Sequence, residues 1–87
     1  MTTTEFLDRP DGRISYDDNG IDGPLVIAAP GMGDTRNSYR HLRDGLAGAG
    51  IRFVTMDVRG MGDSSVDWSD LSDAAVAYDY LALIDEL

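Results

Sequence analysis

The sequence predicts an α/β fold in which parallel strands alternate with helices. Two stretches share one design, because Leu25–Asp34 (LVIAAPGMGD) and Phe53–Ser65 (FVTMDVRGMGDSS) are each a short apolar run that ends in a glycine-bearing turn. A helix-sized segment separates them, as in a right-handed crossover between parallel neighbours. We therefore expect both loops at one edge of the sheet, where open α/β sheets bind ligands.

Length and composition limit what the chain can be. At 87 residues it is shorter than a usual α/β domain, and so small a chain hides only about 60 to 65% of its extended surface on folding. A complete parallel-sheet enzyme is therefore not expected. The absence of cysteine excludes disulfides and thiolate chemistry and favours a cytoplasmic location. The polar start at Met1–Asp8 and the brevity of the longest apolar run, Leu25–Ala29, predict no membrane association.

The charge balance is strongly acidic. Sixteen Asp and Glu residues face seven arginines and no lysine, which gives a net charge of -9. Such a charge disfavours nucleic acid and anionic membranes as partners. Without lysine, neither a Walker A phosphate loop nor Schiff-base catalysis is possible.

Two short strands are expected at the start of the chain. Thr3–Leu7 and Arg13–Tyr16 carry β-branched or aromatic residues, and Arg9–Gly12 (RPDG) between them has the composition of a hairpin turn. A second turn cluster follows at Asp17–Gly23, whose Asn-Gly pair is typical of a type I′ hairpin. The aspartates of that cluster are interpreted as a solvated turn, since the spacing of a calcium loop is absent.

A covered strand and a helix come next. The unbroken apolar run Leu25–Ala29 is typical of a strand covered on both faces. Asn37 or Ser38 is the expected helix cap, and Gly50 the expected stop. His41 should face solvent, which makes it a poor candidate for a catalytic base. The apolar positions at helical spacing are Tyr39, Leu42, Leu46 and Ala49.

The remainder of the chain predicts a strand, a loop and a helix. Ile51–Asp57 is the strand, and the polar, glycine-rich stretch Asp57–Asp67 is the loop. Ser72 is a plausible cap for a helix at Ala74–Leu87. One face of that helix should carry Val76, Tyr80, Leu83 and Leu87, with Asp79 and Asp85 away from it.

These stretches resemble the amino-terminal part of an α/β-hydrolase-fold protein. In that family one strand ends in an oxyanion loop, usually His-Gly-x-Gly, and the next parallel strand ends in Asp-x-Arg-Gly-x-Gly-x-Ser. Here the first motif is PGMG at Pro30–Gly33, and the second is complete at Asp57–Ser64. The helix that carries Asp79-Tyr80 resembles the Asp-Leu helix that precedes the nucleophile strand of the family.

The resemblance implies a specific architecture. Residues 1–87 would be the amino-terminal segment of a single α/β-hydrolase domain, with two leading strands followed by β-α-β-α, and incomplete as a stand-alone domain. The strand ending near Tyr16 would pair beside the Phe53 strand and not with Leu25–Ala29. Leu25–Ala29 would then keep an open apolar edge, which favours aggregation or pairing with another chain.

The resemblance also implies a site. The backbone N–H of Met32 would donate to an oxyanion, and Gly31 and Gly33 would let the backbone approach the substrate. Pro30 replaces the usual His of this loop. No Gly-x-Ser-x-Gly nucleophile elbow is present in the sequence, and the nearest stretch, Gly62–Val66, lacks the second glycine.

The expected activity therefore belongs to a larger protein. Loss of a nucleophile costs on the order of 10⁶ in rate, so this chain alone should be inactive. The nucleophile, its acid and the catalytic His would come from the remainder of the hydrolase or from a second chain. The nucleophile would be Ser, or Asp as in the dehalogenase and epoxide-hydrolase branches. A small-molecule substrate is expected, with no cofactor and no metal.

Three polar residues of the second loop admit two interpretations. Asp57, Arg59 and Asp63 could be an acid, a cation and a metal ligand, but we favour a structural role in which Arg59 and its carboxylate neighbours fix the loop. Ser64 and Ser65 are interpreted as turn and capping residues.

Two other functions stay open. In a dinucleotide-binding fragment the third glycine of each motif should follow, but Arg36 and Ser65 stand at those positions. A non-catalytic interaction module on a hydrolase-like scaffold is the other, because fold does not fix function. Trp68 could cover the core or line a pocket.

Overall fold

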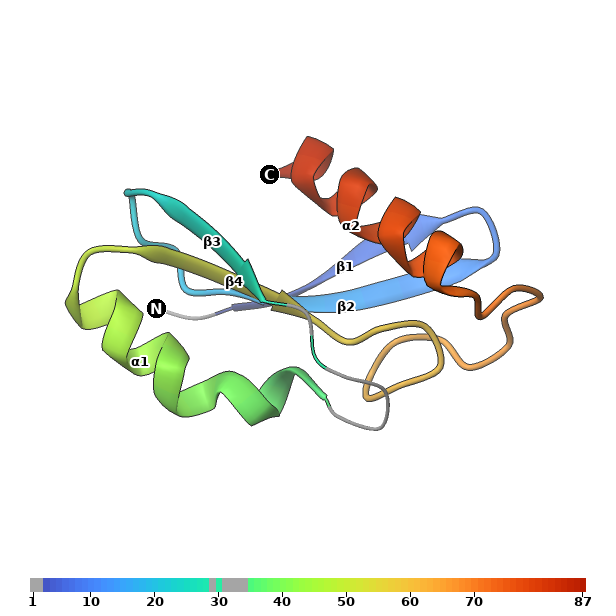
Figure 1. Cartoon of the computed structure of the whole chain (residues 1–87), viewed down its shortest axis with the longest axis horizontal. Helices are drawn as coiled ribbons and strands as arrows, with labels where there is room; N and C mark the ends of the chain where they lie inside the picture. The colour runs from blue at the N-terminus through green and yellow to red at the C-terminus, as the bar shows by residue number, and fades with distance from the viewer. Residues whose placement is uncertain (1–2, 29, 31–34) are drawn as a thin grey trace.

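The chain forms a sheet covered by a helix on each face (Figure 1). The computed structural model describes residues 3–28, 30 and 35–87. Within them the strands lie in the order β1-β2-β4-β3. No helix in these ranges is long and apolar enough to span a membrane. The elements are β1 (Thr3–Arg9), β2 (Gly12–Asp18), β3 (Leu25–Ala28), the 3₁₀ turn η1 (Arg36–Tyr39), α1 (Arg40–Gly48), β4 (Arg52–Met56) and α2 (Asp73–Glu86).

The two leading strands form the predicted hairpin. β1 and β2 are antiparallel, from the pair Thr3–Asp18 to the pair Arg9–Gly12, so the RPDG turn closes the ladder. The Asn-Gly turn after β2 does not make a second hairpin with β3. Instead, β2 lies antiparallel beside β4, with Tyr16 opposite Met56. The pairing implied by the family resemblance is therefore confirmed.

β3 and β4 form the predicted parallel pair. Leu25 lies opposite Arg52 and Ala28 opposite Thr55. The chain crosses from one strand to the other through η1 and α1. Because the strands are parallel, the segments that follow Ala28 and Met56 leave the same edge of the sheet.

β3 is an edge strand. The side chains of Leu25 and Val26 remain 42% and 39% exposed. The expectation of a strand covered on both faces is therefore wrong for this chain, because these two side chains stay exposed. Among the described residues β4 is the only strand paired with β3. The prediction of an open apolar edge is confirmed.

The start of the first helix differs from the prediction. Neither Asn37 nor Ser38 caps it, because the chain enters α1 through the 3₁₀ turn η1, and the N-cap position falls on Tyr39 without a side-chain hydrogen bond. The backbone N–H of Ser38 already donates to the Thr35 carbonyl at 3.0 Å. Residues suited to a helix cap are present at 37 and 38, but the tighter 3₁₀ turn already provides a backbone acceptor.

α1 covers the lower face of the sheet in Figure 1 only thinly. Tyr39 packs edge-on against Phe53, with ring centroids 6.2 Å apart, whereas Leu42 is half exposed. His41 is exposed, as predicted. Gly50 follows the helix with a positive φ of 75°, which agrees with its predicted role as a stop.

α2 covers the opposite face and packs on the main core (Figure 1). Ser72 caps it, and its side chain accepts from the backbone N–H of Ala75 at 3.2 Å. The predicted apolar face is confirmed, since Leu83 is fully buried and Val76, Tyr80 and Leu87 pack around the cluster. The buried members of that cluster are Leu7, Ile14, Tyr16, Val54, Met56, Val58 and Leu83.

Candidate functional site

The candidate site lies at the carboxyl ends of β3 and β4. Met32, Gly31 and Gly33, the predicted oxyanion-loop residues, fall outside the described residues. Two residues that flank them are described: Pro30, which is buried after β3, and Arg36, which opens η1. These two residues and the loop that follows β4 are therefore the described surroundings of the predicted site.

Asp57, the first residue after β4, is a fully buried carboxylate at the centre of this edge. Its Oδ2 accepts from the Ser15 hydroxyl at 2.8 Å and from the Asp63 backbone N–H at 3.1 Å. Its Oδ1 accepts from the Arg36 backbone N–H at 2.7 Å, and the Arg36 guanidinium binds Oδ2. Burial raises the pKa of the Asp57 carboxyl, but these donors outweigh burial and hold the pKa below its ordinary value.

Arg36 joins three carboxylates, one from β2 and two from the loop after β4. Its guanidinium binds Asp57, lies 2.9 Å from Asp63 and, through Nε, lies 2.9 Å from Asp17 of β2. The Nε contact is an ion pair without hydrogen-bond alignment, because Nε makes no hydrogen bond of good geometry. Burial lowers the pKa of Arg36, but Asp63 and Asp17 outweigh it and raise the pKa overall. Arg36 therefore stays a cation.

The loop after β4 wraps around the same carboxylate. Gly62 has a positive φ of 50°, and a Cβ at this position would collide with the Asp57 carboxylate. The Ser64 hydroxyl donates to the Asp57 carbonyl at 2.7 Å and accepts from the Ser15 backbone N–H at 3.0 Å. Ser65 accepts from the Arg13 backbone N–H at 3.0 Å. Both serines therefore hold the loop against β2, as the structural interpretation predicted.

Arg59 points to the other face of the sheet and binds α2. Its Nε lies 2.6 Å from Asp79 Oδ2 and its Nη2 lies 2.9 Å from Asp79 Oδ1, while Arg9 of β1 also reaches Oδ1 at 2.9 Å. The hydrogen bonds that Arg59 donates to Asp79 raise the pKa of Arg59. Trp68 stacks on the Arg59 guanidinium at 4.3 Å and packs against the core cluster, so it is a core cover.

These contacts correct two expectations from the sequence. Arg59 does fix the loop, but its partner is Asp79, and the cation that binds Asp57 and Asp63 is Arg36. Asp79 was placed away from the packed face of its helix, but it is fully buried because two arginines satisfy its charge.

One sequence signal could have found part of the cluster. β2 alternates, so that Ile14 and Tyr16 join the core under α2, and Ser15 and Asp17 must then point to the opposite face. A buried face built from polar residues needs a partner, and Arg36 supplies it. Nothing in the local sequence of Arg36 shows this role.

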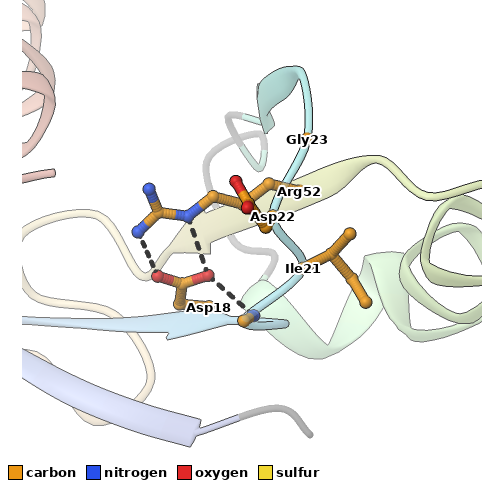
Figure 2. Close-up of a pocket in the computed structure, with 6 residues that line it drawn as sticks. Asp18, Ile21, Asp22, Gly23 and Arg52 are labelled. Atoms are coloured by element: carbon orange, nitrogen blue, oxygen red, sulfur yellow. Dashed lines mark hydrogen bonds and ion pairs between the residues drawn. The ribbon is translucent and has the colours of Figure 1, made fainter.

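A pocket of about 290 Å³ opens at the other end of the strands, where β4 begins (Figure 2). Its charged groups satisfy one another: Arg52 binds Asp18 at 2.5 and 3.2 Å, and the Gly20 backbone N–H donates to Asp18 at 3.0 Å. The Arg52 hydrogen bond lowers the pKa of Asp18. In the described parts of the chain, no group of acidic or His side chains is arranged to hold a metal ion. We interpret the residues that line this pocket as a solvated turn.

The fold and this edge together define a class. An antiparallel hairpin leads into a parallel pair whose second strand ends in the complete Asp-x-Arg-Gly-x-Gly-x-Ser loop, and a helix covers each face. The chain has the fold of the amino-terminal part of an α/β hydrolase.

Comparisons with known proteins agree with this class. Epoxide hydrolase B of Mycobacterium tuberculosis (strain ATCC 25618 / H37Rv) is 49% identical over 43 residues, which are 49% of this chain and 12% of that protein. The epoxide hydrolase of Vigna radiata has a TM-score of 0.88 at 26% identity, over 98% of this chain and 28% of that chain. An epoxide hydrolase from an endophytic Streptomyces has a TM-score of 0.80 at 34% identity, over 97% and 26%. No family model matches the chain.

The chain therefore spans between about a tenth and under a third of the length of these relatives. It matches an α/β-hydrolase fragment, with nearly all of its own length aligned to the two structures.

Proposed function

We propose that this chain supplies the oxyanion loop of a cofactor-free hydrolase. In this proposal the backbone N–H of Met32, between Gly31 and Gly33, donates to the negative charge that develops on the substrate. The nucleophile, its acid and the catalytic His come from the remainder of the protein or from a second chain, which pairs with the open edge of β3. The chain alone is inactive.

One observation carries the proposal: β3 and β4 are parallel, and the segment after β3 is bound to the segment after β4 through Arg36 and Asp57. Parallel strands whose following loops meet at one edge form the usual ligand-binding edge of α/β sheets. The predicted oxyanion loop lies in the sequence between Pro30 and Arg36. Its two ends therefore belong to that edge.

Two substrate classes are candidates for this hydrolase. Esters and amides are the general expectation for a hydrolase of this fold. The 49% and 34% identities to epoxide hydrolases favour an epoxide as the second candidate. In that case an Asp carboxylate opens the ring to give an ester, and water then cleaves the ester to release a vicinal diol and regenerate the carboxylate. The oxyanion of the second step is the charge that Met32 would stabilise.

The test uses the full protein that contains this chain, with 4-nitrophenyl acetate and styrene oxide as probes. Met32→Pro removes the backbone N–H, and Met32→Ala keeps it. We expect kcat to fall by about 10² to 10³ in Met32→Pro and to change little in Met32→Ala, because only the first variant loses a donor. Thermal unfolding of each variant checks that it is folded.

Two outcomes would overturn the proposal. One is a full protein that hydrolyses neither probe, which would favour the interaction-module alternative. The other is a folded Met32→Pro variant with the activity of the parent protein.

A further inference from the structure

Arg36 binds the buried carboxylate of Asp57 through both its backbone and its side chain. Its N–H donates to Asp57 Oδ1 at 2.7 Å, and its guanidinium binds Oδ2 of the same residue. Asp57 is fully buried and follows β4 directly. The position of Arg36 is therefore fixed relative to the carboxyl end of β4 by two independent bonds.

The remaining guanidinium nitrogens lie against two further carboxylates. Nε faces Asp17 of β2 and Nη2 faces Asp63 of the glycine loop, each at 2.9 Å. The side chain of Arg36 is only 10% exposed. A planar guanidinium carries donors on three nitrogens in a fixed fork and can serve three carboxylates at once, whereas the donors of a lysine ammonium all lie on one atom.

The cluster also carries an excess of negative charge. Arg43 lies 3.9 Å from Asp17 but also pairs with Asp44, so among these described residues two guanidiniums face the four carboxylates of Asp17, Asp44, Asp57 and Asp63. Removal of Arg36 would leave the carboxylates of Asp17, Asp57 and Asp63 repelling one another. Arg36 therefore holds β2 and the loop after β4 together.

We propose that Arg36 is a positioning residue for the oxyanion loop. It fixes the residue at which the chain enters η1, after the predicted oxyanion loop in the sequence, against the carboxyl end of β4. A donor contributes to catalysis only when it is held within about 0.5 Å of its productive place. This inference rests on the proposed function.

The first test measures catalysis in the full protein. In Arg36→Met we expect kcat for 4-nitrophenyl acetate to fall by about 10²-fold with KM nearly unchanged, since displaced donors lose transition-state stabilisation more than substrate binding. Arg36→Lys should recover only part of this loss. The matched control is Arg52→Met, which removes an arginine paired with Asp18 at the other end of the strands and should keep the parent kcat.

The second test needs no activity. The backbone N–H groups of Arg36 and Asp63 both donate to Asp57, so their hydrogen exchange should accelerate in Arg36→Met and stay unchanged in Arg52→Met. A full protein that is inactive on both probes overturns the proposed function, and exchange alone then decides whether Arg36 holds this edge. Unchanged exchange, or an unchanged kcat in an active protein, overturns the positioning role.

If Arg36→Met does not fold, Asp63→Asn replaces it. Asp63 is 66% exposed, so this variant removes one of the three contacts without opening the core. We expect a fall in kcat of about 3- to 10-fold, corresponding to one weakened charged hydrogen bond. A folded Asp63→Asn variant with parent kcat and parent exchange at Arg36 contradicts the proposal.

Discussion

The carboxylate of Asp79 binds the guanidinium of Arg59 through two hydrogen bonds, 2.6 Å long to Nε and 2.9 Å long to Nη2. Asp79 is fully buried and the Arg59 side chain is 8% exposed. Arg9 of β1 shares the same carboxylate. One acidic side chain of α2 therefore joins the hairpin, the loop after β4 and the helix that covers the core.

Asp79→Asn should destabilise the protein strongly. The substitution leaves Arg59 as a buried cation without its counter-charge, and the loss of one partner from a buried pair costs about 3 to 5 kcal/mol. Urea unfolding measures this change. The control is Asp8→Asn, because Asp8 forms an exposed pair with Arg13 and should contribute less than about 1 kcal/mol. Equal effects of the two substitutions would show that the Asp79 cluster contributes no more than a surface pair.

Gly62→Ala should destabilise the loop after β4. Its positive φ disfavours any Cβ, and this Cβ would also collide with the Asp57 carboxylate, so we expect a loss of about 1 to 3 kcal/mol. Gly45→Ala in α1 is the matched control, since a Cβ there meets nothing within 4 Å. That substitution should stabilise the helix by about 0.5 to 1 kcal/mol. Thermal unfolding should therefore shift in opposite directions for the two variants, and shifts in the same direction would contradict the prediction.

Ser72→Ala should lower the free energy of unfolding by about 1 kcal/mol, because the N-terminus of α2 loses its side-chain acceptor for the Ala75 N–H. Ser38→Ala makes the same chemical change at a serine that caps no helix and should be neutral within about 0.5 kcal/mol. Chemical unfolding of both variants decides the point. A loss at Ser38 equal to that at Ser72 would mean that η1 depends on the serine hydroxyl.

Acid should weaken the carboxylate cluster around Asp57. The pKa of this group lies below its ordinary value of 3.8 in the folded protein, so ionised Asp57 stabilises the fold above that value, and the contribution disappears as pH falls through the folded pKa. The groups that face it are Arg36, Asp63 and Ser15, and Asp17 shares the same arginine.

Asp57→Asn is the matching variant. It should lose about 1.5 to 3 kcal/mol near neutral pH, where charged hydrogen bonds are removed. Its unfolding free energy should then approach that of the parent protein below pH 3.8, as the pH falls through the folded pKa of Asp57 and the parent loses the same ionised group. Curves that stay parallel down to acid unfolding would exclude Asp57 as a source of the pH dependence.

Much of the fold could be predicted from local patterns. The RPDG turn closes the β1–β2 hairpin, and the cap at Ser72 and the stop at Gly50 stand where the sequence placed them. The pairing of β2 with β4 could not be derived from the Asn-Gly turn, which favours a local hairpin. It required the family resemblance, because strand order depends on contacts between residues far apart in the chain.

The buried charges were harder to predict. A helical pattern places Asp79 by its neighbours on one helix, but its burial depends on Arg9 and Arg59, which lie 70 and 20 residues away. Arg36 likewise has no local signal, since its three carboxylates come from β2 and from the loop after β4. Ion pairs of this kind are set by the assembled sheet.

Trp68 is an intrinsic fluorescent reporter of this chain. This single tryptophan stacks on Arg59, donates its indole N–H to the Ser65 carbonyl and lies against Gly12, where an added Cβ would meet its ring at 2.8 Å. The wavelength and quenching of its emission should therefore report when the loop after β4 docks onto the β1–β2 hairpin. Fluorescence can measure the time of this docking without any attached dye.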